Sequence, residues 1–357
     1  MFRCDAAHTG VCATQDAGTH LRVLWRFRTD RLNRSSPIVA FGNVYVGSNS
    51  GDLYALHART GKLIWKFRTH GALTSSPAIF EHLVIFAGGE GAIYALNADT
   101  GKQRWRFATG PDVAFPDPYQ WDFYQSSPAV SGGTVYIGSG DANIYALDAR
   151  TGALRWKHRT NGRVRSSPAV YGDVVYAGSM DGNLYALDAR TGAQRWRFKT
   201  AGNTDFPLGE VQSTPAVAGG RVYFGSRDGF LYALNARTGA KLWTHDEKGS
   251  WIISGPAVAN GDVIFGTSDN HSVEALSAAT GAQVWKFGAN GRVFASPVVV
   301  GSHVYVGTCD SEVVVLDLKT GKTVSFAPSE GTIYSSPYVA AGVLYYSSDD
   351  GYIYAAR

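Results

Sequence analysis

The stretch SSPAVYGDVVYAGSMDGNLYALDARTGAQRWRFKT, from Ser166 to Thr200, is the clearest copy of a unit that recurs along the whole chain. Local rules divide it into four short strands. Gly172-Asp173 and Asp181-Gly182 are tight-turn signals, and Gly192 supplies the positive φ that the third turn needs. Four strands in a unit of about 40 residues are typical of one blade of a β-propeller.

The number of units follows from two landmarks. Triplets related to Ser-Ser-Pro begin eight times, at Ser35, Ser75, Ser126, Ser166, Ser213, Ser254, Ala295 and Ser335. Thr-Gly pairs at the matching place in the unit begin seven times, at Thr60, Thr100, Thr151, Thr191, Thr238, Thr280 and Thr320. The last unit ends at Arg357, before its Thr-Gly pair and its Trp strand, whereas an orphan Trp strand, LRVLWRFRT, spans residues 21–29.

These two ends fit together if strand 21–29 completes the last blade, because ring closure removes an open sheet edge. The sequence therefore predicts an all-β fold: one eight-bladed β-propeller of four-stranded antiparallel blades over residues 21–357, closed by strand 21–29. Residues 1–20 are expected to be an N-terminal tail that packs on the propeller.

The segment YALDARTGAQRWRF, from Tyr185 to Phe198, and its near-copy beginning at Tyr145 resemble the quinoprotein (PQQ-type) propeller repeat. The resemblance covers residues 21–357. The stretch FRCDAAHTG, from Phe2 to Gly10, is similar to the N-terminal stretch of such proteins, with Cys4 where the family has Gly. The family includes redox enzymes that bind pyrroloquinoline quinone, outer-membrane assembly scaffolds without a cofactor, and sensor domains joined to kinases. The resemblance thus implies the fold and leaves the activity open.

Cofactor and metal binding are not expected. Dehydrogenases of the family hold the quinone with adjacent cysteines, calcium ligands and a Trp on the channel floor, but this chain has no adjacent Cys pair and Cys309 stands alone. Cys4, His8 and Cys12 are spaced four apart and could bind zinc with His20. The alternative is a tail with incidental thiols or one local disulfide, and we favour it because Gly and Ala around them offer no rigid support.

Charge and hydropathy bear on partners and location. The net charge is +4, yet many basic residues lie in Trp strands such as 195–199, where alternation points Trp and Phe inward and Arg outward. We therefore expect no nucleic-acid partner. No stretch is apolar enough to span a membrane, and the first residues lack a signal-peptide core. The chain as written is expected to be cytoplasmic, or exported if it is a mature or trimmed form.

Two connections between blades are longer than the others. The one within 109–125 is eleven residues longer than the regular connection, and the one within 200–212 is seven residues longer. Both run from the outer strand of one blade to the inner strand of the next, on the face where propellers usually bind ligands. The first insert is acidic and aromatic and includes Trp121 and Asp122, which suits a binding site on a rigid scaffold. A cap over the channel mouth or a contact in a homo-oligomer are the alternatives.

The residue before each Ser-Ser-Pro-like triplet begins the innermost strand, so eight such residues should ring the channel mouth. They are Arg34, Thr74, Gln125, Arg165, Gln212, Ile253, Phe294 and Tyr334. The first five are mostly polar or cationic and the last three are apolar or aromatic. That asymmetry suits a ligand with an anionic or hydrogen-bonding end and a flat apolar end; random drift at a solvated position is the alternative. The predicted ligand-binding residues are Arg34, Gln125, Arg165, Gln212, Phe294, Tyr334, Trp121 and Trp251.

Catalytic candidates are few. The sixth unit has an enlarged turn in which His271 precedes Glu274, and Glu274 replaces the Tyr of most other units. The two could form an acid/base pair if both faced the mouth; a structural role for Glu274 is the alternative, and Asp122 is a third candidate. With no nucleophile motif or phosphate loop, we expect a binding scaffold for a small molecule or a protein partner at the insert-bearing channel mouth. A cofactor-independent enzyme acting there on a small anionic or aromatic substrate is the alternative, and a PQQ-dependent dehydrogenase is less favoured.

Overall fold

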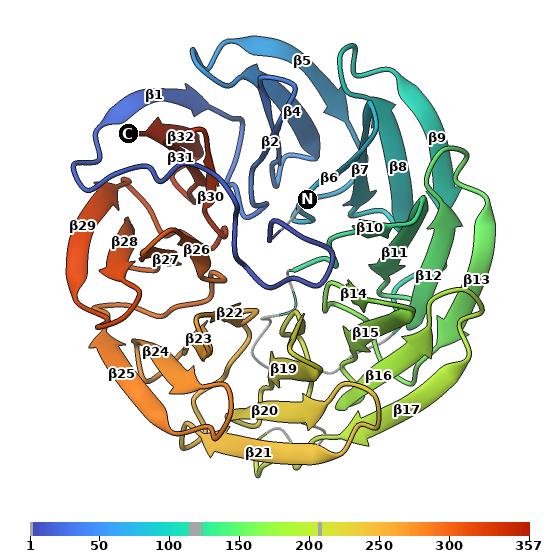
Figure 1. Ribbon diagram of the computed structural model, residues 1–357. Coiled ribbons are helices and arrows are strands. Elements are labelled where there is room, and N and C mark those ends of the chain that lie inside the picture. Colours follow the sequence, from blue (N-terminus) through green and yellow to red (C-terminus); the bar gives the residue numbers. More distant parts are fainter. Residues whose placement is uncertain (1–2, 114–121, 123, 206–208) are drawn as a thin grey trace.

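The blades are arranged in a closed ring. The computed structural model describes residues 3–113, 122, 124–205 and 209–357, and in these residues 32 strands form eight four-stranded antiparallel sheets. The sheets stand around a central axis, each with its shortest strand innermost (Figure 1). The predicted eight-bladed propeller is confirmed. The quoted unit from Ser166 forms one blade of four strands, and the expected turns at Gly172-Asp173, Asp181-Gly182 and Gly192 lie between them.

Blades one to four comprise β2 (Ile38–Ala40), β3 (Asn43–Gly47), β4 (Asp52–His57) and β5 (Leu63–Arg68); β6 (Ala78–Phe80), β7 (Leu83–Gly88), β8 (Ala92–Asn97) and β9 (Gln103–Ala108); β10 (Ala129–Ser131), β11 (Thr134–Gly138), β12 (Asn143–Asp148) and β13 (Leu154–Arg159); and β14 (Ala169–Tyr171), β15 (Val174–Gly178), β16 (Asn183–Asp188) and β17 (Gln194–Lys199).

Blades five to eight comprise β18 (Ala216–Ala218), β19 (Arg221–Gly225), β20 (Phe230–Asn235) and β21 (Lys241–Asp246); β22 (Ala257–Ala259), β23 (Asp262–Gly266), β24 (Ser272–Ser277) and β25 (Gln283–Gly288); β26 (Val298–Val300), β27 (His303–Thr308), β28 (Glu312–Asp317) and β29 (Thr323–Pro328); and β30 (Tyr338–Ala340), β31 (Val343–Ser347), β32 (Tyr352–Ala356) and β1 (Val23–Arg28).

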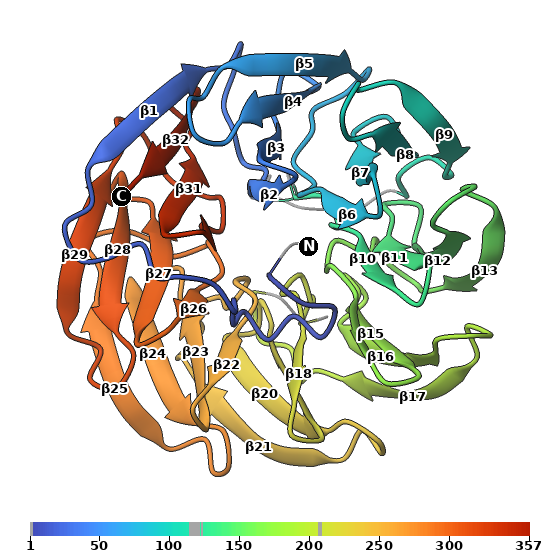
Figure 2. The ribbon, with the colours of Figure 1, turned by 45° about the horizontal axis from the view of Figure 1, so that its top comes forward.

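The ring closes where the two ends of the chain meet. Strand β1 pairs with β32 in antiparallel register, with Trp25 opposite Ala355 and Arg28 opposite Tyr352. The first strand is therefore the outer strand of the last blade, as Figure 2 shows beside the C-terminus. Closure by the N-terminal strand is confirmed, and the last blade has no unpaired outer edge at β32.

In each blade whose outer strand carries a Trp, that Trp connects the blade to the next one. Trp156, for example, donates from Nε1 to the carbonyl of Ala189 at 2.9 Å and packs on Gly192, whose φ is +73°. The same hydrogen bond to the following blade recurs for Trp25, Trp65, Trp105, Trp156, Trp196, Trp243 and Trp285. We call it the Trp–turn contact. It explains why the Thr-Gly pair repeats: the Gly adopts a positive φ and leaves room for the ring.

The Ser-Ser doublets connect the blades near the axis. The first serine donates to the next blade, as Ser126 Oγ does to the carbonyl of Ser166 at 3.0 Å. The second serine accepts from the blade before it, as Ser167 Oγ does from the N–H of Ser127 at 2.9 Å. The series passes from the last blade to the first, where Ser336 N–H donates to Ser36 Oγ at 2.8 Å. We call this set of bonds the serine ring.

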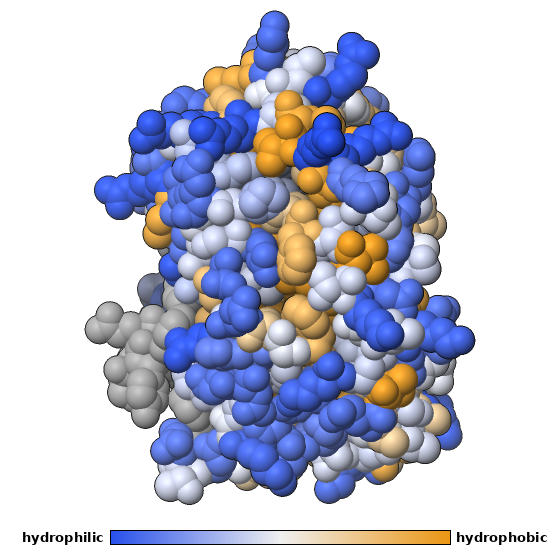
Figure 3. All heavy atoms as spheres, turned by 90° about the vertical axis from the view of Figure 1, so that its left-hand side faces the viewer, coloured by the Kyte–Doolittle hydropathy of each residue, from blue (hydrophilic) through white to orange (hydrophobic). Residues whose placement is uncertain are grey.

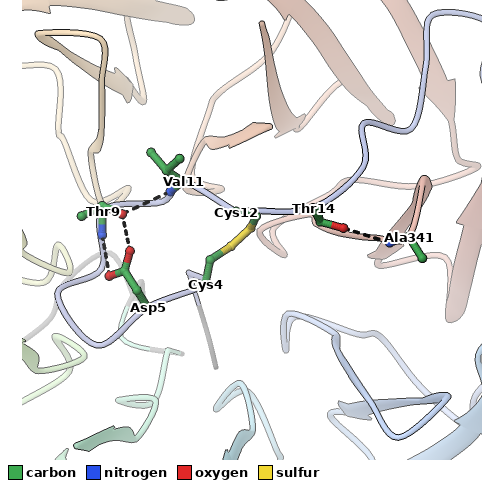
Figure 4. Close-up of a disulfide and its surroundings, with 7 residues drawn as sticks. All are labelled: Cys4, Asp5, Thr9, Val11, Cys12, Thr14 and Ala341. Carbon is green, nitrogen blue, oxygen red and sulfur yellow. Dashed lines mark hydrogen bonds between the residues drawn. A yellow bond between two sulfur atoms is a disulfide. The ribbon is translucent and has the colours of Figure 1, made fainter. Parts of the chain in front are cut away.

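The N-terminal tail covers one end of the channel. Carbonyls of Ala6, Ala7, Thr9 and Gly10 accept N–H groups of four successive inner strands, from Val170, Val217, Val258 and Val299, at 2.6–2.9 Å. In Figure 1 the tail crosses the centre of the ring in front of the blades. Cys4 and Cys12 form a disulfide within it (Figure 4), so the local disulfide, and not a zinc site that uses both thiols, is what the structure contains.

The rim of the ring is mainly hydrophilic. Along β17 the Trp and Phe side chains are half-buried and their Arg and Lys neighbours are exposed, which confirms the expected alternation. Figure 3 shows apolar side chains scattered among hydrophilic ones on one side of the molecule. Among the residues that the structure describes, no helix has the length and apolar character needed to cross a membrane.

The Trp–turn contact makes a testable prediction. A Cβ on Gly192 would lie 2.7 Å from the Trp156 ring, whereas a Cβ on Gly172, at a similar φ of +61°, would meet nothing within 4 Å. Gly172→Ala should lower the free energy of unfolding by about 1 kcal/mol, because an alanine in the left-handed backbone conformation costs about that much and meets no other atom. Gly192→Ala should cost about 3 kcal/mol, because overpacking adds to the same backbone term. Chemical denaturation measures both, and equal losses would contradict the contact.

A second prediction concerns the tail. Replacing both cysteines (Cys4→Ser with Cys12→Ser) removes a cross-link that limits the freedom of the undocked tail, so the tail should detach more often. Hydrogen exchange followed by mass spectrometry should then show faster exchange at Val217, Val258 and Val299, whose N–H groups bond to the tail. Peptides from β16, which lies inside a blade, should exchange as before. Unchanged protection at the three valines would show that the disulfide does not hold the tail.

Candidate functional site

The eight residues of the predicted ring do surround one cavity. A narrow space on the axis is lined by Arg34, Thr74, Gln125, Arg165, Gln212, Ile253, Phe294 and Tyr334, together with Tyr124 and the second hydroxyl residue of seven doublets. Because each residue precedes the inner strand of its blade, the eight side chains lie at one level of the channel. The repeat was a sufficient signal to find them.

The aromatic part of the ring adjoins its cationic part. Phe294 and Tyr334 stack with ring centroids 5.7 Å apart and planes 8° from parallel. The guanidinium of Arg34 lies 4.4 Å from the centre of the Tyr334 ring, within cation–π range. One side of the cavity thus offers a stacked aromatic surface that ends in a positive charge.

Arg34 is neutralised within the protein. Its Nη2 lies 2.9 Å from Oδ2 of Asp349, and its Nε lies 3.1 Å from the same oxygen. Both side chains are largely buried, at 16% and 14% exposure. Burial raises the pKa of Asp349 above its usual value, although the hydrogen bond and charge of Arg34 oppose the shift. In this pair, burial disfavours the charged carboxylate while Arg34 favours it.

Arg165 is also paired, with two carboxylates of the first insert. Its Nε donates to Asp122 Oδ1 at 2.7 Å and its Nη2 to Asp112 Oδ2 at 2.6 Å. Arg163 contacts Asp122 as well and donates from Nε to the carbonyl of Val113 at 2.7 Å. Burial works against ionisation of Asp122, but the hydrogen bonds and charges of the two arginines outweigh it and place its pKa below the usual value. Asp122 is an anchor for the insert, with a charged carboxylate.

The two glutamines are occupied by backbone and by a neighbouring arginine. Gln125 accepts the N–H groups of Thr74 and Ser75 and donates to the carbonyl of Ala72. Gln212 accepts from Arg227 at 2.9 Å and 3.2 Å.

Trp251 contacts the same cation. The guanidinium of Arg227 lies 5.2 Å from the centre of the Trp251 ring, so this predicted ligand platform holds a side chain of the protein itself. Trp121 lies outside the described residues.

The channel leaves little free volume on its axis, and the tail covers the end opposite the ring residues. The axial cavity holds only about 60 Å³, with Tyr124 among its lining residues. Burial raises the pKa of the Tyr124 hydroxyl well above its usual value.

Arg3 of the tail is 2% exposed, donates to the carbonyl of Pro256 and packs on Gly255. Gly255 stands where the other blades have Ser or Thr, and a Cβ there would overlap the guanidinium. The replacement of Ser or Thr by Gly255 is thus the one feature of the sequence that could have indicated the position of Arg3.

A larger cavity opens beside the channel on the insert-bearing face. It holds about 260 Å³ between blades two and three, and we call it the blade 2–3 cavity. Its walls combine backbone of Gly88, Gly89 and Gly140 with the side chains of Asp112 and Arg165. It also shares Thr74, Tyr124, Gln125 and Arg165 with the axial site, so the two spaces are adjacent.

The catalytic candidates do not assemble. The buried Glu274 carboxylate accepts from Lys286 Nζ at 2.5 Å and from Ser272 Oγ at 2.8 Å, and no hydrogen bond among the described residues joins it to His271. Asp122 lines the blade 2–3 cavity, where Arg163 and Arg165 hold it in the anchor described above. The structural role of Glu274, weighed as the alternative, is the one that its contacts support.

Pyrroloquinoline quinone does not fit the residues present. A site for a ligand of its size usually holds about 300 Å³ or more, against about 60 Å³ in the axial cavity. The expectation of no cofactor stays a prediction.

Fold and repeat define the class: a quinoprotein-type propeller with a tail-covered end. A family model described as "Beta-alanine-activating enzyme, beta-propeller" matches residues 123–357, and one described as "Outer membrane protein assembly factor BamB" matches residues 15–116. As the first match spans more than half of the chain, the protein belongs to that β-propeller family. No curated protein matches the chain significantly.

Solved structures share the fold. BamB from Moraxella catarrhalis is 23% identical, with a TM-score of 0.76 over 95% of this chain and 98% of that one. The quinohemoprotein alcohol dehydrogenase from Comamonas testosteroni is 15% identical, with a TM-score of 0.81 over 99% of this chain and 79% of that one. A europium-containing methanol dehydrogenase is 16% identical, with a TM-score of 0.80 over 98% and 90%. At these identities the likeness concerns the fold alone.

The Asp122 anchor predicts a pH dependence. Because its folded pKa lies below the unfolded value of about 3.9, the stabilisation is complete above that value and disappears as the pH falls through the folded pKa. Asp122→Asn should lower the free energy of unfolding by about 3 kcal/mol at pH 7, since two buried arginines lose their carboxylate. The difference from the wild type should shrink toward pH 2.

The matched control is Asp205→Asn, which removes one exposed charge from the second insert. It should change stability by less than about 0.5 kcal/mol at any pH. A loss at Asp122 that is the same at pH 7 and pH 2 would contradict an ionised anchor.

Proposed function

We propose that this protein is a binding scaffold whose recognition surface is the channel mouth on the insert-bearing face. The observation that carries the proposal is the difference between the two faces of one ring. The tail covers the opposite end through backbone hydrogen bonds to four blades, and the non-repeated side chains of the ring gather at the other end. A rigid ring with one free mouth suits recognition at that mouth.

A protein segment is the favoured ligand, with a small molecule as the alternative. The axial cavity of about 60 Å³ is too small for most metabolites, while the adjoining blade 2–3 cavity of about 260 Å³ can take one or two side chains of a partner. The match of residues 15–116 to a family described as an assembly factor supports this preference. An acidic side chain of the partner would bind Arg34 in place of Asp349, and an aromatic one would pack on Phe294 and Tyr334.

The enzyme alternative has less support. Of its proton-transfer candidates, Asp122 is an ionised anchor and Glu274 is held by Lys286. For the location, the Cys4–Cys12 disulfide supports the exported alternative, because disulfides persist in oxidising compartments.

Site-specific photo-crosslinking tests the proposal. A photoreactive phenylalanine is placed at position 49, which lines the blade 2–3 cavity, or at position 41, in the turn between β2 and β3 on the tail-covered face of the same blade. In the native host, position 49 should give a discrete protein adduct and position 41 should not. Native mass spectrometry of the purified chain then separates the two kinds of ligand. A bound small molecule, together with no crosslinked protein at position 49, would favour the small-molecule alternative. Equal labelling at both positions would overturn the assignment of the mouth.

A further inference from the structure

The contact between blades five and six differs from the others in its chemistry. At four other junctions a Phe on the outer strand meets the edge of a Tyr on the third strand of the next blade, with centroids 5.4–5.6 Å apart, as for Phe198 and Tyr232. Here His245 of β21 and Glu274 of β24 occupy those two positions. Both apolar members have been replaced at the same junction.

A third departure lies beside them. Thr200 stands two residues after its Phe and donates from its hydroxyl to the carbonyl of Gly182, and Thr29, Thr69 and Thr160 donate in the same way to backbone carbonyls. In blade five Glu247 takes that position. Its side chain is 3% exposed, and that of Glu274 is 1% exposed. Three repeat positions have thus exchanged apolar or neutral groups for a His and two buried carboxylates.

Neighbouring donors orient each carboxylate so that one oxygen is held and the other faces His245. Glu274 Oε1 accepts from Lys286 and Ser272, which leaves Oε2 at 3.9 Å from His245 Nε2. Glu247 Oε2 accepts from Asn270 Nδ2 at 2.7 Å, which leaves Oε1 at 2.9 Å from the same nitrogen. The three atoms all lie within 4.8 Å of one another. Ligating carboxylates in proteins are typically held by donors on the second oxygen in this way.

The charges at the junction leave room for a cation. Two buried carboxylates, Glu247 and Glu274, face one ammonium, that of Lys286, which is 42% exposed. Buried charges are stable only when paired or bound to a metal. Three ligand atoms bound tetrahedrally at about 2.0–2.2 Å from an ion would lie about 3.4 Å apart, within the range seen here.

We propose that His245 Nε2, Glu247 Oε1 and Glu274 Oε2 bind one divalent transition-metal ion of the zinc class. An imidazole ligand with two carboxylates suits zinc and its neighbours better than calcium or magnesium, which take oxygen ligands. Solvent supplies the fourth ligand on the side of His245, whose side chain is 23% exposed. The ion joins the outer strand of blade five to the third strand of blade six, so it cross-links two blades at a distance from the channel mouth.

Zinc titration of the full chain tests the site. Chelator-treated protein is titrated with zinc chloride by calorimetry and heated with and without the ion. We expect one ion per chain and a melting temperature that rises with zinc concentration, because the ion binds the folded state. Zinc-edge anomalous diffraction should place the ion between His245 and Glu274. Absence of binding would overturn the proposal and leave a buried ion-pair network only.

The repeat supplies the matched variants. His245→Phe with Glu274→Tyr copies the pair at four neighbouring junctions, so it should keep the fold and weaken zinc binding at least about 100-fold. Asn270→Ala, which keeps all three ligands, should weaken it about tenfold and serves if the double variant does not fold. Lys286→Met removes the competing cation and should strengthen binding, whereas a purely ionic network would lose stability and gain no zinc affinity. His20→Ala, at an exposed position in the tail, should change nothing. Full affinity in the double variant would place the zinc elsewhere and refute the assignment.

Discussion

Hydrogen bonds between neighbouring Ser-Ser doublets set the distance between blades near the axis, and the channel and its lining depend on them. The eight sheets share no strand ladder, so no strand pairing holds one blade to the next. The doublets are buried at the narrowest part of the ring, and most of their hydroxyls bond to the backbone of an adjacent blade, whereas those of Ser254 and Ser335 bond to carbonyls of their own blades. At the wide part of each blade the Trp–turn contact does the same through an indole N–H. The blades are thus joined at two radii, and the residue before each doublet is held at a defined height in the channel.

That construction explains why the ring residues form pairs with one another and with nearby turns. A side chain fixed at the mouth of a narrow channel loses water, so a charge there requires a partner. Arg34 and Arg165 find carboxylates on the turn of the last blade and on the first insert. The partner of Arg34 has a raised pKa, and the partners of Arg165 tie the insert to blade four. The mouth is thus lined by internal ion pairs, and under the proposed function an incoming acidic group would replace a carboxylate of the protein.

The fold could be predicted because the unit repeats, and the ring residues because they sit at one fixed offset from a repeated triplet. Their partners could not be predicted in the same way. Asp349, Arg163 and Arg227 lie on turns that the repeat does not distinguish, and which turn meets which side chain depends on the rotation from blade to blade. The replacement of the usual Tyr by Glu274 was visible in the sequence. Its neighbour His245, however, lies in the preceding unit, and the sequence alone does not show that the two side chains meet between blades five and six. The Cys4 and Cys12 spacing is compatible with either a disulfide or metal ligation, and only the tail's path decides between them.

The pairing of β1 with β32 has a consequence for biosynthesis. Strand β1 is translated before every other strand of the propeller and has its partner at residues 352–356, so its edge stays unpaired until the last blade has been translated. Contacts between segments so distant in the chain form slowly, and an exposed strand edge invites pairing with other molecules in the meantime. The interval between translation of the first and last strands is therefore when this protein most needs a chaperone.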